Sequence, residues 1–230
     1  MDFDEASSLY REAHKKNITC TGEDPEYFHA MKARIVAGAL KPEMRPGLRV
    51  LDYGCGLGLV TRQLKKLLPD ADVHGADPSI KSVEIAAGET RGISFRHFDG
   101  KAAPYGENSF DAVLLSCVLH HVPEGRQAVY ADIHRVLAPG KRLFIFEHNP
   151  LNPLTRRAVN TCVFDEGAVL IGRRACVKEL QEAGFSIVET RYIVFFPGFL
   201  KKLRPLEDVL GWLPLGGQYV ICAAKEEHKK

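Results

Sequence analysis

The chain of 230 residues lacks an apolar run close to the roughly 18 residues that a membrane-spanning helix requires. Its first residues, Met1 to Glu5, carry three acidic side chains and no basic segment ahead of an apolar stretch, which is not the pattern of a secretory signal. From these two absences we expect a soluble, cytoplasmic protein.

Cysteine pairs and a charge excess are missing too. The six cysteines are scattered and none forms a C-x-x-C pair, which argues against a zinc ribbon, a redox motif or a disulfide framework. The formal net charge of +2 is too small for a phosphate-binding face, so we expect no nucleic-acid partner. With 45% hydrophobic residues and no internal repeats, a single domain over 1–230 is the simplest expectation.

The most informative stretch is Val50 to Gly58, where a short apolar run leads into an acid and three glycines at alternate positions. This pattern predicts a buried strand that breaks sharply toward a helix at 59–68. Because glycine has no Cβ, Gly54, Gly56 and Gly58 allow a polar ligand to lie against bare backbone N–H and C=O groups. The loop is therefore predicted to be a cofactor cradle.

Strand-like and helix-like segments alternate along the rest of the chain. Strands are predicted at 49–51, 73–76, 93–97, 112–116, 142–146, 185–196 and 218–224, and helices at 27–40, 59–68, 80–88, 127–137 and 174–183. Such alternation predicts an α/β fold, a doubly wound and mostly parallel sheet with helices on both faces.

Three segments fall outside this alternation. Residues 1–47 are predicted to form a helical N-terminal cap, and 149–172 and 197–217 are inserts that interrupt the rhythm. In open α/β sheets ligands bind beyond the carboxyl ends of the strands, so we expect both inserts to be walls on the substrate side.

Two acids follow the glycine loop at the ends of predicted strands. Asp77 lies 25 residues after Asp52, where a carboxylate can accept hydrogen bonds from both hydroxyls of a ribose, although it could equally cap the next helix. Asp99 ends the third strand and could reach an adenine amino group. Asp52 itself could shape the loop by accepting backbone N–H bonds.

The glycine spacing, Asp-x-Gly-x-Gly-x-Gly, departs from the G-x-G-x-x-G fingerprint of dinucleotide-binding folds. It resembles the first motif of the class I S-adenosylmethionine-dependent methyltransferases. Further motifs of that family are matched by Asp77, by Phe98-Asp99-Gly100, by Ser109 to His121 and by Leu137 to Lys141. The resemblance covers 48–146 and implies a seven-stranded sheet of order 3-2-1-4-5-7-6 with the last strand antiparallel.

The resemblance also implies the cofactor and its contacts. The cofactor would be S-adenosyl-L-methionine, with S-adenosyl-L-homocysteine as the product. The implied binding residues are Asp52, Gly54 and Gly56 for the methionine end, Asp77 with Pro78 or Ser79 for the ribose, Asp99 and Gly100 for the adenine, and Ser116 and His121 near the sulfonium. Parts of 147–165 and 203–219 look like a bacterial subgroup of surface-glycan and lipid-linked sugar pathways, which implies a small-molecule or lipid-linked acceptor.

Histidines near the ends of two strands are candidates for a general base. His121 or His148 could take a proton from a substrate hydroxyl, and each could equally pack against the cofactor or stabilise the loop. A metal site is not predicted, because His148, Asn149 and Asp165 match no strong ligand spacing.

The C-terminal insert carries an apolar stripe between Phe195 and Leu213, flanked by Lys201, Lys202 and Arg204. Two interpretations stay open: a lid helix packed on the domain, and peripheral contact with a membrane surface through 197–217.

Together the patterns predict an enzyme that methylates a small-molecule or lipid-linked acceptor, with oxygen as the preferred acceptor atom. The alternatives are a non-catalytic methyltransferase-like binding protein and a nicotinamide-dependent oxidoreductase, and the glycine spacing argues against the second. The sequence leaves the oligomeric state open.

Overall fold

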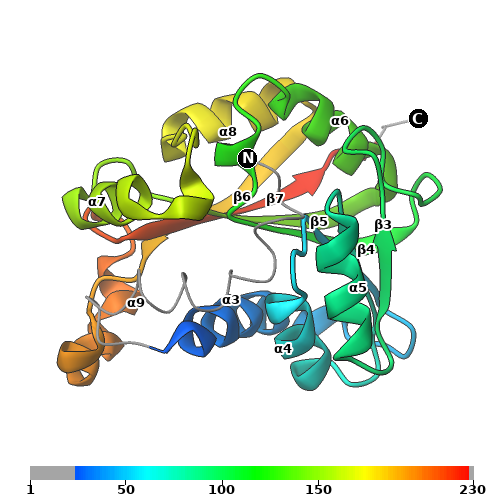
Figure 1. Cartoon of the computed structure of the whole chain (residues 1–230), viewed down its shortest axis with the longest axis horizontal. Coiled ribbons are helices and arrows are strands. Elements are labelled where there is room, and N and C mark those ends of the chain that lie inside the picture. The colour runs from blue at the N-terminus through cyan, green and yellow to red at the C-terminus, as the bar shows by residue number, and fades with distance from the viewer. Residues whose placement is uncertain (1–23, 228–230) are drawn as a thin grey trace.

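The computed structural model describes residues 24–227, and over these residues a seven-stranded sheet lies between two layers of helices (Figure 1). The strands are β1 (Arg49–Tyr53), β2 (Asp72–Asp77), β3 (Ser94–His97), β4 (Phe110–Ser116), β5 (Leu137–His148), β6 (Phe185–Ile193) and β7 (Gln218–Lys225). The α-helices are α3 (Pro25–Leu40), α4 (Leu59–Leu67), α5 (Ile80–Gly88), α6 (Arg126–Val136), α7 (Pro153–Thr161), α8 (Arg173–Glu182) and α9 (Glu207–Leu210).

The sheet has the order β3-β2-β1-β4-β5-β7-β6. The first five strands pair in parallel, and β7 pairs antiparallel with both β5 and β6. The α/β fold class, the strand order and the antiparallel last strand predicted from the sequence are thereby confirmed. The carboxyl ends of β1, β2, β4 and β5 meet along one edge, which is where such sheets bind ligands.

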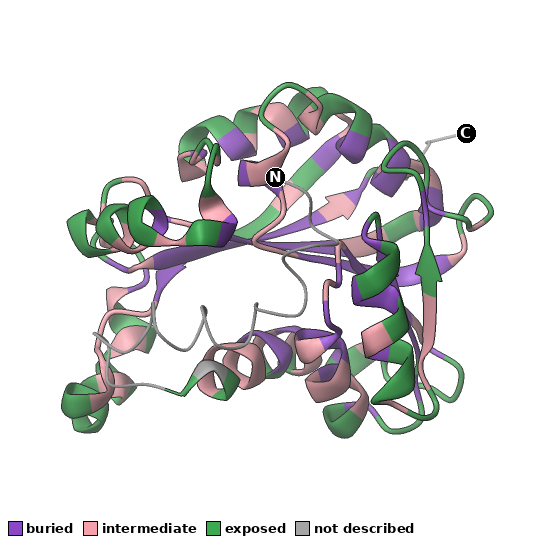
Figure 2. Cartoon of the chain, viewed as in Figure 1, coloured by how far each residue is buried: buried purple, intermediate pink, exposed green. Residues whose placement is uncertain are grey.

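Two hydrophobic cores follow from the alternation of side chains along each strand. Leu51, Val113 and Ile145 point to the face covered by α6 and α8, whereas Val50, Leu114 and Phe144 point to the face covered by α3 and α4. Figure 2 shows the buried residues concentrated along the sheet and the inward sides of these helices. Because β1 and β4 are buried on both faces, their carboxyl ends are fixed rigidly.

Some element boundaries differ from the sequence prediction. Strand β6 ends at Ile193 instead of 196, because Val194 has a φ of 64° and turns the chain out of the sheet. Strand β5 begins at Leu137 instead of 142: Leu137 pairs with Phe110, and the next pair joins Arg142 to Ala112, so the ladder is irregular between these two pairs. The remaining boundaries agree within two residues.

The predicted N-terminal cap is described only from residue 24. Helix α3 begins after Asp24, whose side chain accepts a hydrogen bond from the backbone N–H of Glu26, and it ends in a 3₁₀ turn, η2 (Lys41–Glu43). It packs beside α4. The part of the cap prediction that concerns 1–23 lies outside the described residues.

The two inserts adopt short helical segments. Residues 149–172 contain α7 and the 3₁₀ turn η4 (Val163–Asp165), and 197–217 contain the 3₁₀ segment η5 (Gly198–Leu206) followed by α9. The inserts are tied together, because the Asn149 side-chain amide donates to the carbonyls of Pro214 and Gly216. Among residues 24–227, no helix is both long and apolar enough to span a bilayer.

Candidate active site

A cavity of about 410 Å³ opens at the carboxyl ends of β1, β2, β4 and β5. Its wall includes the glycine loop, the ends of β2 and β4, one face of α3 and part of the first insert. Of the residues implied as cofactor contacts, Asp52, Gly54, Gly56, Asp77, Pro78, Ser116 and His121 line it, and so does the second candidate base, His148. The sheet therefore brings together side chains from distant parts of the sequence.

The glycine loop is closed by the backbone of the next strand. The N–H groups of Gly54 and Cys55 both donate to the carbonyl of Ala76. A Cβ on Gly54 would lie 2.6 Å from Val118 Cγ2, and its φ is 75°, so glycine is required by the protein's own packing. Gly56 differs, because a Cβ there would meet no atom within 4 Å. Only Gly56 thus leaves room on the cavity side for a ligand.

Asp52 is buried at the end of β1, and its two carboxylate oxygens have different surroundings. Oδ2 accepts a hydrogen bond of 2.6 Å from the Thr61 hydroxyl, while Oδ1 is buried without a hydrogen-bond partner. Burial raises the pKa of Asp52 to about 7; the nearby Asp77 adds to this rise, and the Thr61 hydrogen bond and the Lys32 ammonium oppose it. An acceptor atom in this state is suited to a ligand that carries a positive, hydrogen-bonding group.

The carboxylate that accepts a backbone N–H bond from the glycine loop is that of Asp77, a role that the sequence suggested for Asp52. Its Oδ2 accepts from the N–H of Gly56 at 2.7 Å, and its Oδ1 accepts from the N–H of Ser79 at 2.8 Å. The cap of α5 is Ser79, whose hydroxyl oxygen accepts from the N–H of Ser82, so Asp77 is not the helix cap.

Asp99 and Gly100 do not line the cavity. The Asp99 side chain is 63% exposed and accepts a hydrogen bond from the N–H of Lys101. Gly100 lies beside the cavity rim, because a Cβ on it would come within 4.0 Å of Pro78 Cβ. Their contact with an adenine stays a prediction.

A buried lysine meets the end of β4. Lys32 of α3 is 4% exposed, and its Nζ donates to Ser116 Oγ at 2.9 Å and lies 3.2 Å from Cys117 Sγ. Burial alone would raise the pKa of the Cys117 thiol, but the charges of Lys32 and His148 outweigh it and lower that pKa to about 6. Cys117 also has a φ of 60°, a strained value for a residue with a side chain, and such strain is common at functional sites.

His120 and Glu147 form a buried pair that holds the turn after β4. Glu147 Oε1 accepts from the N–H of Leu119 at 2.7 Å, and Oε2 lies 2.6 Å from His120 Nδ1. Burial disfavours both charges, yet their mutual attraction wins, so the pKa of His120 is well above its usual value and that of Glu147 is lowered. Asp165 of the first insert, 3.4 Å from His120 Nε2, adds a second carboxylate.

The two candidate bases lie on the same wall of the cavity. The rings of His120 and His121 are 4.1 Å apart, and those of His120 and His148 are 5.2 Å apart. Burial and the charge of the neighbouring His120 together lower the pKa of His121 to about 4, against the opposing charges of Asp165 and Glu147. His121 is therefore an uncharged imidazole at neutral pH.

Two residues of this site were not predicted from the sequence: Thr61 lies in α4 and supports Asp52, and Lys32 contacts the end of β4. Glu147, which the sequence places beside His148 at the end of the fifth strand, is a buried anchor of the turn after β4. Only Lys32 left a signal, because it interrupts the apolar helical positions Phe28 and Ile35 at a spacing that faces the core. The set of His148, Asn149 and Asp165 considered for a metal is not assembled, since the Asn149 side chain is used by backbone groups.

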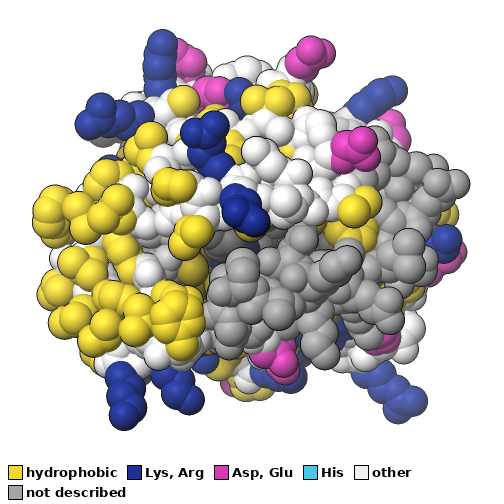
Figure 3. Space-filling view, turned by 60° about the vertical axis from the view of Figure 1, so that its left-hand side comes forward, with side chains coloured by type: hydrophobic (Ala, Val, Ile, Leu, Met, Phe, Trp, Pro, Cys, Tyr) yellow, Lys and Arg dark blue, Asp and Glu magenta, His cyan; other side chains and the backbone are white. Residues whose placement is uncertain are grey.

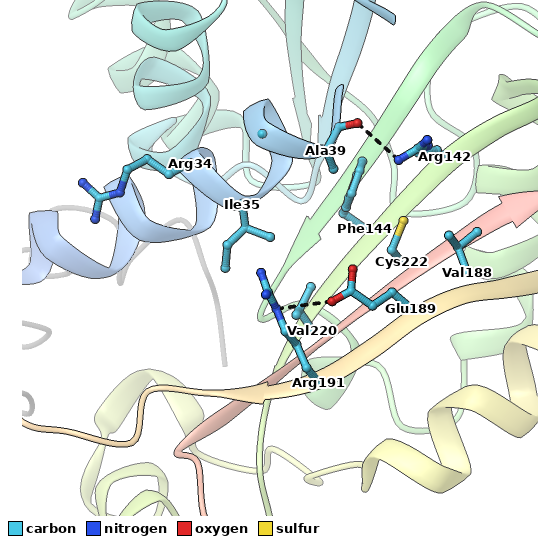
Figure 4. Close-up of a pocket in the computed structure, with 11 residues that line it drawn as sticks. Arg34, Ile35, Ala39, Arg142, Phe144, Val188, Glu189, Arg191, Val220 and Cys222 are labelled. Carbon is cyan, nitrogen blue, oxygen red and sulfur yellow. Dashed lines mark hydrogen bonds and ion pairs between the residues drawn. The ribbon is translucent and has the colours of Figure 1, made fainter. Parts of the chain in front are cut away.

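A second cavity, of about 460 Å³, lies between α3 and strands β5, β7 and β6 (Figure 4). Three of its charged side chains have partners in the wall: Arg142 donates to the carbonyl of Ala39, and Arg191 lies 3.6 Å from Glu189. None of the glycine-loop residues borders it. The chemistry predicted from the sequence therefore belongs to the first cavity.

Comparison with known proteins agrees with this geometry. Residues 51–145 match a family model described as a methyltransferase domain. The chain is 34% identical over 106 residues to a demethylmenaquinone methyltransferase of Thermus thermophilus, covering 44% of this chain and 48% of that protein. It is 28% identical over 162 residues to cycloartenol-C-24-methyltransferase 1 of Oryza sativa subsp. japonica, covering 65% and 47%. The chain thus spans about half the length of these curated relatives.

Solved structures show the same fold. An S-adenosylmethionine-dependent methyltransferase from Mesorhizobium loti superposes with a TM-score of 0.59 at 24% identity, over 81% of this chain and 96% of that one. At this identity the similarity concerns the fold alone.

Proposed function

We propose that the chain is a class I S-adenosylmethionine-dependent methyltransferase and that it methylates a small, apolar, lipid-like acceptor taken from a membrane surface. The proposal of methyl transfer rests on the environment of the Asp52 carboxylate. Its Oδ1 is buried without a hydrogen-bond partner at the wall of the cavity, next to the open backbone of Gly56. A buried acceptor of this kind is costly unless a ligand satisfies it.

The residues present fit the cofactor. Asp52 with Gly56 would hold the amino-acid end, and Asp77 with Ser79 and Pro78 would hold the ribose. When bound, S-adenosyl-L-methionine supplies an electrophilic methyl group and leaves as S-adenosyl-L-homocysteine. The protein's own contribution is then to align the acceptor, exclude water and hold at most one proton.

His121 is the first candidate for the residue that accepts this proton. It lines the cavity as an uncharged imidazole, and a pKa of about 4 makes it a weak base better suited to orienting an acceptor hydroxyl than to deprotonating it fully. His148 is the second candidate, on the same wall. Replacing each with glutamine tests both; unchanged turnover at every pH with normal cofactor affinity would remove the proposal.

Oxygen and carbon are the two candidates for the atom that accepts the methyl group. The sequence favours oxygen, while one relative carries the name of a C-24-methyltransferase, which favours carbon. An apolar acceptor suits both, because the names of the relatives point to a quinone precursor and to a sterol. Carbon-13 NMR of the labelled product distinguishes an O-methyl from a C-methyl group.

The membrane part rests on an exposed apolar face formed by the two inserts. It consists of Leu151, Leu154, Phe199, Leu203, Leu206, Val209, Trp212 and Leu215. Figure 3 shows hydrophobic side chains gathered on this end of the molecule, with lysines and arginines at its border. Phe199 is 76% exposed and Trp212 72%, so the insert is not a lid packed on the domain through these side chains.

This apolar face adjoins the cavity through one helix. Helix α7 turns Thr155 and Ala158 into the cavity, while Leu154 is 78% exposed on the outside. Lys201 and Lys202 are exposed in the neighbouring η5 segment. Apolar side chains with basic neighbours are typical of peripheral contact with anionic lipid, and a lipid-like acceptor could enter the cavity from such a surface.

Calorimetry tests the cofactor assignment. We expect heat of binding with S-adenosylmethionine and S-adenosylhomocysteine and none with NADH, which separates methyl transfer from nicotinamide chemistry. A lipid extract incubated with labelled S-adenosylmethionine then tests catalysis; binding without any labelled product would support the binding-protein alternative. Folded protein that binds neither sulfur compound would refute the proposal.

Flotation with vesicles tests the membrane part. We expect binding to vesicles of phosphatidylglycerol and phosphatidylcholine, and its loss in the double variant Phe199→Ser and Trp212→Ser. The matched control is Ile80→Ser, because Ile80 is 49% exposed on α5, away from the inserts. Equal flotation of the double variant and wild type would contradict this part alone.

A further inference from the structure

Three side chains direct metal-binding atoms toward one point on the cavity wall. His120 and His121 come from the 3₁₀ turn η3 (Leu119–His121) after β4, and Asp165 comes from η4 in the first insert. One ligand atom from each lies within 4.8 Å of the other two. All three residues line the cavity in which we place methyl transfer.

The separations agree with a shared ion. Asp165 Oδ1 lies 3.4 Å from His120 Nε2 and 3.7 Å from His121 Nε2. Two ligand atoms at about 2.1 Å from a tetrahedral zinc ion are about 3.4 Å apart. The distance from Asp165 to His120 equals this value, that from Asp165 to His121 is slightly longer, and the two imidazole nitrogens lie within 4.8 Å of each other.

His120 is prepared as a ligand by its other ring nitrogen. Glu147, which is completely buried, holds Nδ1 at 2.6 Å and so directs Nε2 toward Asp165. Nε2 is buried, and at 3.4 Å its contact with Asp165 is not a directed hydrogen bond. A carboxylate on the far nitrogen of a histidine is the usual support of a metal-bound imidazole.

The donor set selects a class of ion. Two imidazoles and one carboxylate suit zinc and iron(II), whereas magnesium and calcium prefer oxygen ligands. Glu147 and Asp165 together carry two negative charges, which offset those of a divalent cation, and the ion takes the place of the proton on His120 Nε2, which is released to solvent. Three protein ligands also leave a coordination position for a ligand from the cavity.

We propose that His120, His121 and Asp165 bind one divalent transition-metal ion of the zinc class, with its open position toward the cavity. Binding would fix the first insert to the end of β4, since Asp165 belongs to the insert. The open position would take an oxygen atom of the acceptor, such as a hydroxyl or carbonyl group; only this last step rests on the proposed function.

The test uses the full chain, freed of metal with a chelator and without a histidine tag. We expect one equivalent of Zn²⁺ by calorimetry and elemental analysis, a higher melting temperature with Zn²⁺, and no effect of Mg²⁺. Asp165→Asn and His121→Asn should each weaken Zn²⁺ binding by more than about 100-fold, the largest loss usual for a supporting residue. His148→Gln is the matched control, because His148 lies on the same wall outside the ligand set.

Cofactor binding separates this proposal from the proposed function. Wild type and Asp165→Asn are titrated with S-adenosylhomocysteine, and similar affinities with loss of Zn²⁺ only in the variant support the metal site. Absence of Zn²⁺ binding by wild type that binds S-adenosylhomocysteine overturns it. Retention of Zn²⁺ by both ligand variants, or its loss in His148→Gln, also overturns it, because the ion would then lie elsewhere.

Discussion

From the buried carboxyl group of Asp52 we predict that cofactor affinity depends on pH. Its carboxyl group is buried, its pKa is raised from 3.8 to about 7, and only the ionised form can pair with the ammonium group of the cofactor. Cofactor binding should therefore weaken as the pH falls below about 7. A shift of about 3 pKa units corresponds to about 4 kcal/mol for ionising Asp52 in the empty site.

The size of the effect follows from the fraction of ionised Asp52. That fraction is about 0.03 at pH 5.5 and about 0.9 at pH 8 for a pKa of about 7, so the dissociation constant of S-adenosylhomocysteine should fall about 30-fold between these pH values. The Cys55 thiol beside Asp52 does not produce this change, because its pKa is raised well above 9.

Isothermal titration at half-unit steps of pH measures this profile. Asp52→Asn should bind weakly and with no change between pH 5.5 and 8. Thr61→Val removes the hydrogen bond that lowers the pKa of Asp52, so its midpoint should move to higher pH, whereas Thr61→Ser should keep it. Cys117→Ser controls for the thiol that ionises near pH 6.

The stability of the cofactor-free protein should fall as the pH rises, whereas cofactor affinity rises. The folded-state pKa of Asp52 lies above its unfolded value, so the protonated group favours folding, and cofactor-free protein should lose stability as the pH rises from about 4 to 7. Asp52→Asn should remove this loss. An affinity of wild type that stays constant from pH 5.5 to 8, or an Asp52→Asn variant with the wild-type profile, would refute the reasoning.

Three further predictions follow from other residues of the site. Gly54→Ala should lower the free energy of unfolding by about 1–3 kcal/mol in urea denaturation, because its φ is 75° and its Cβ would lie 2.6 Å from Val118, whereas Gly56→Ala should lower it by less, because only the φ of 50° strains it, and should also weaken cofactor binding. Asp77→Asn should weaken S-adenosylhomocysteine binding at least tenfold and Asp99→Asn only a few-fold, since Asp99 is 63% exposed; equal losses would contradict the placement. Alkylation of Cys117 by iodoacetamide, followed by mass spectrometry, should accelerate near pH 6, and Lys32→Met should shift this midpoint upward.

The sequence determined the fold and most of the cofactor cradle, for a local physical reason. Hydrophobic runs of strand length, separated by helical segments, bury both faces of a parallel sheet when helices cover each side, as they do in a doubly wound fold. Asp52 and Gly56 belong to one continuous loop, and Asp77 ends the next strand, so their proximity follows from the connection of β1 to β2. The Asp99 assignment shows the limit, because strand order does not fix the direction of an exposed side chain.

Only the tertiary structure decided which groups share an environment. Lys32 and Ser116 are 84 residues apart, and His120 and Asp165 are 45 residues apart, yet each pair is in contact. Burial and charge then give the adjacent His120 and His121 opposite pKa shifts, although the sequence presents them as equals. These properties depend on packing between distant segments, and no local pattern contains that information.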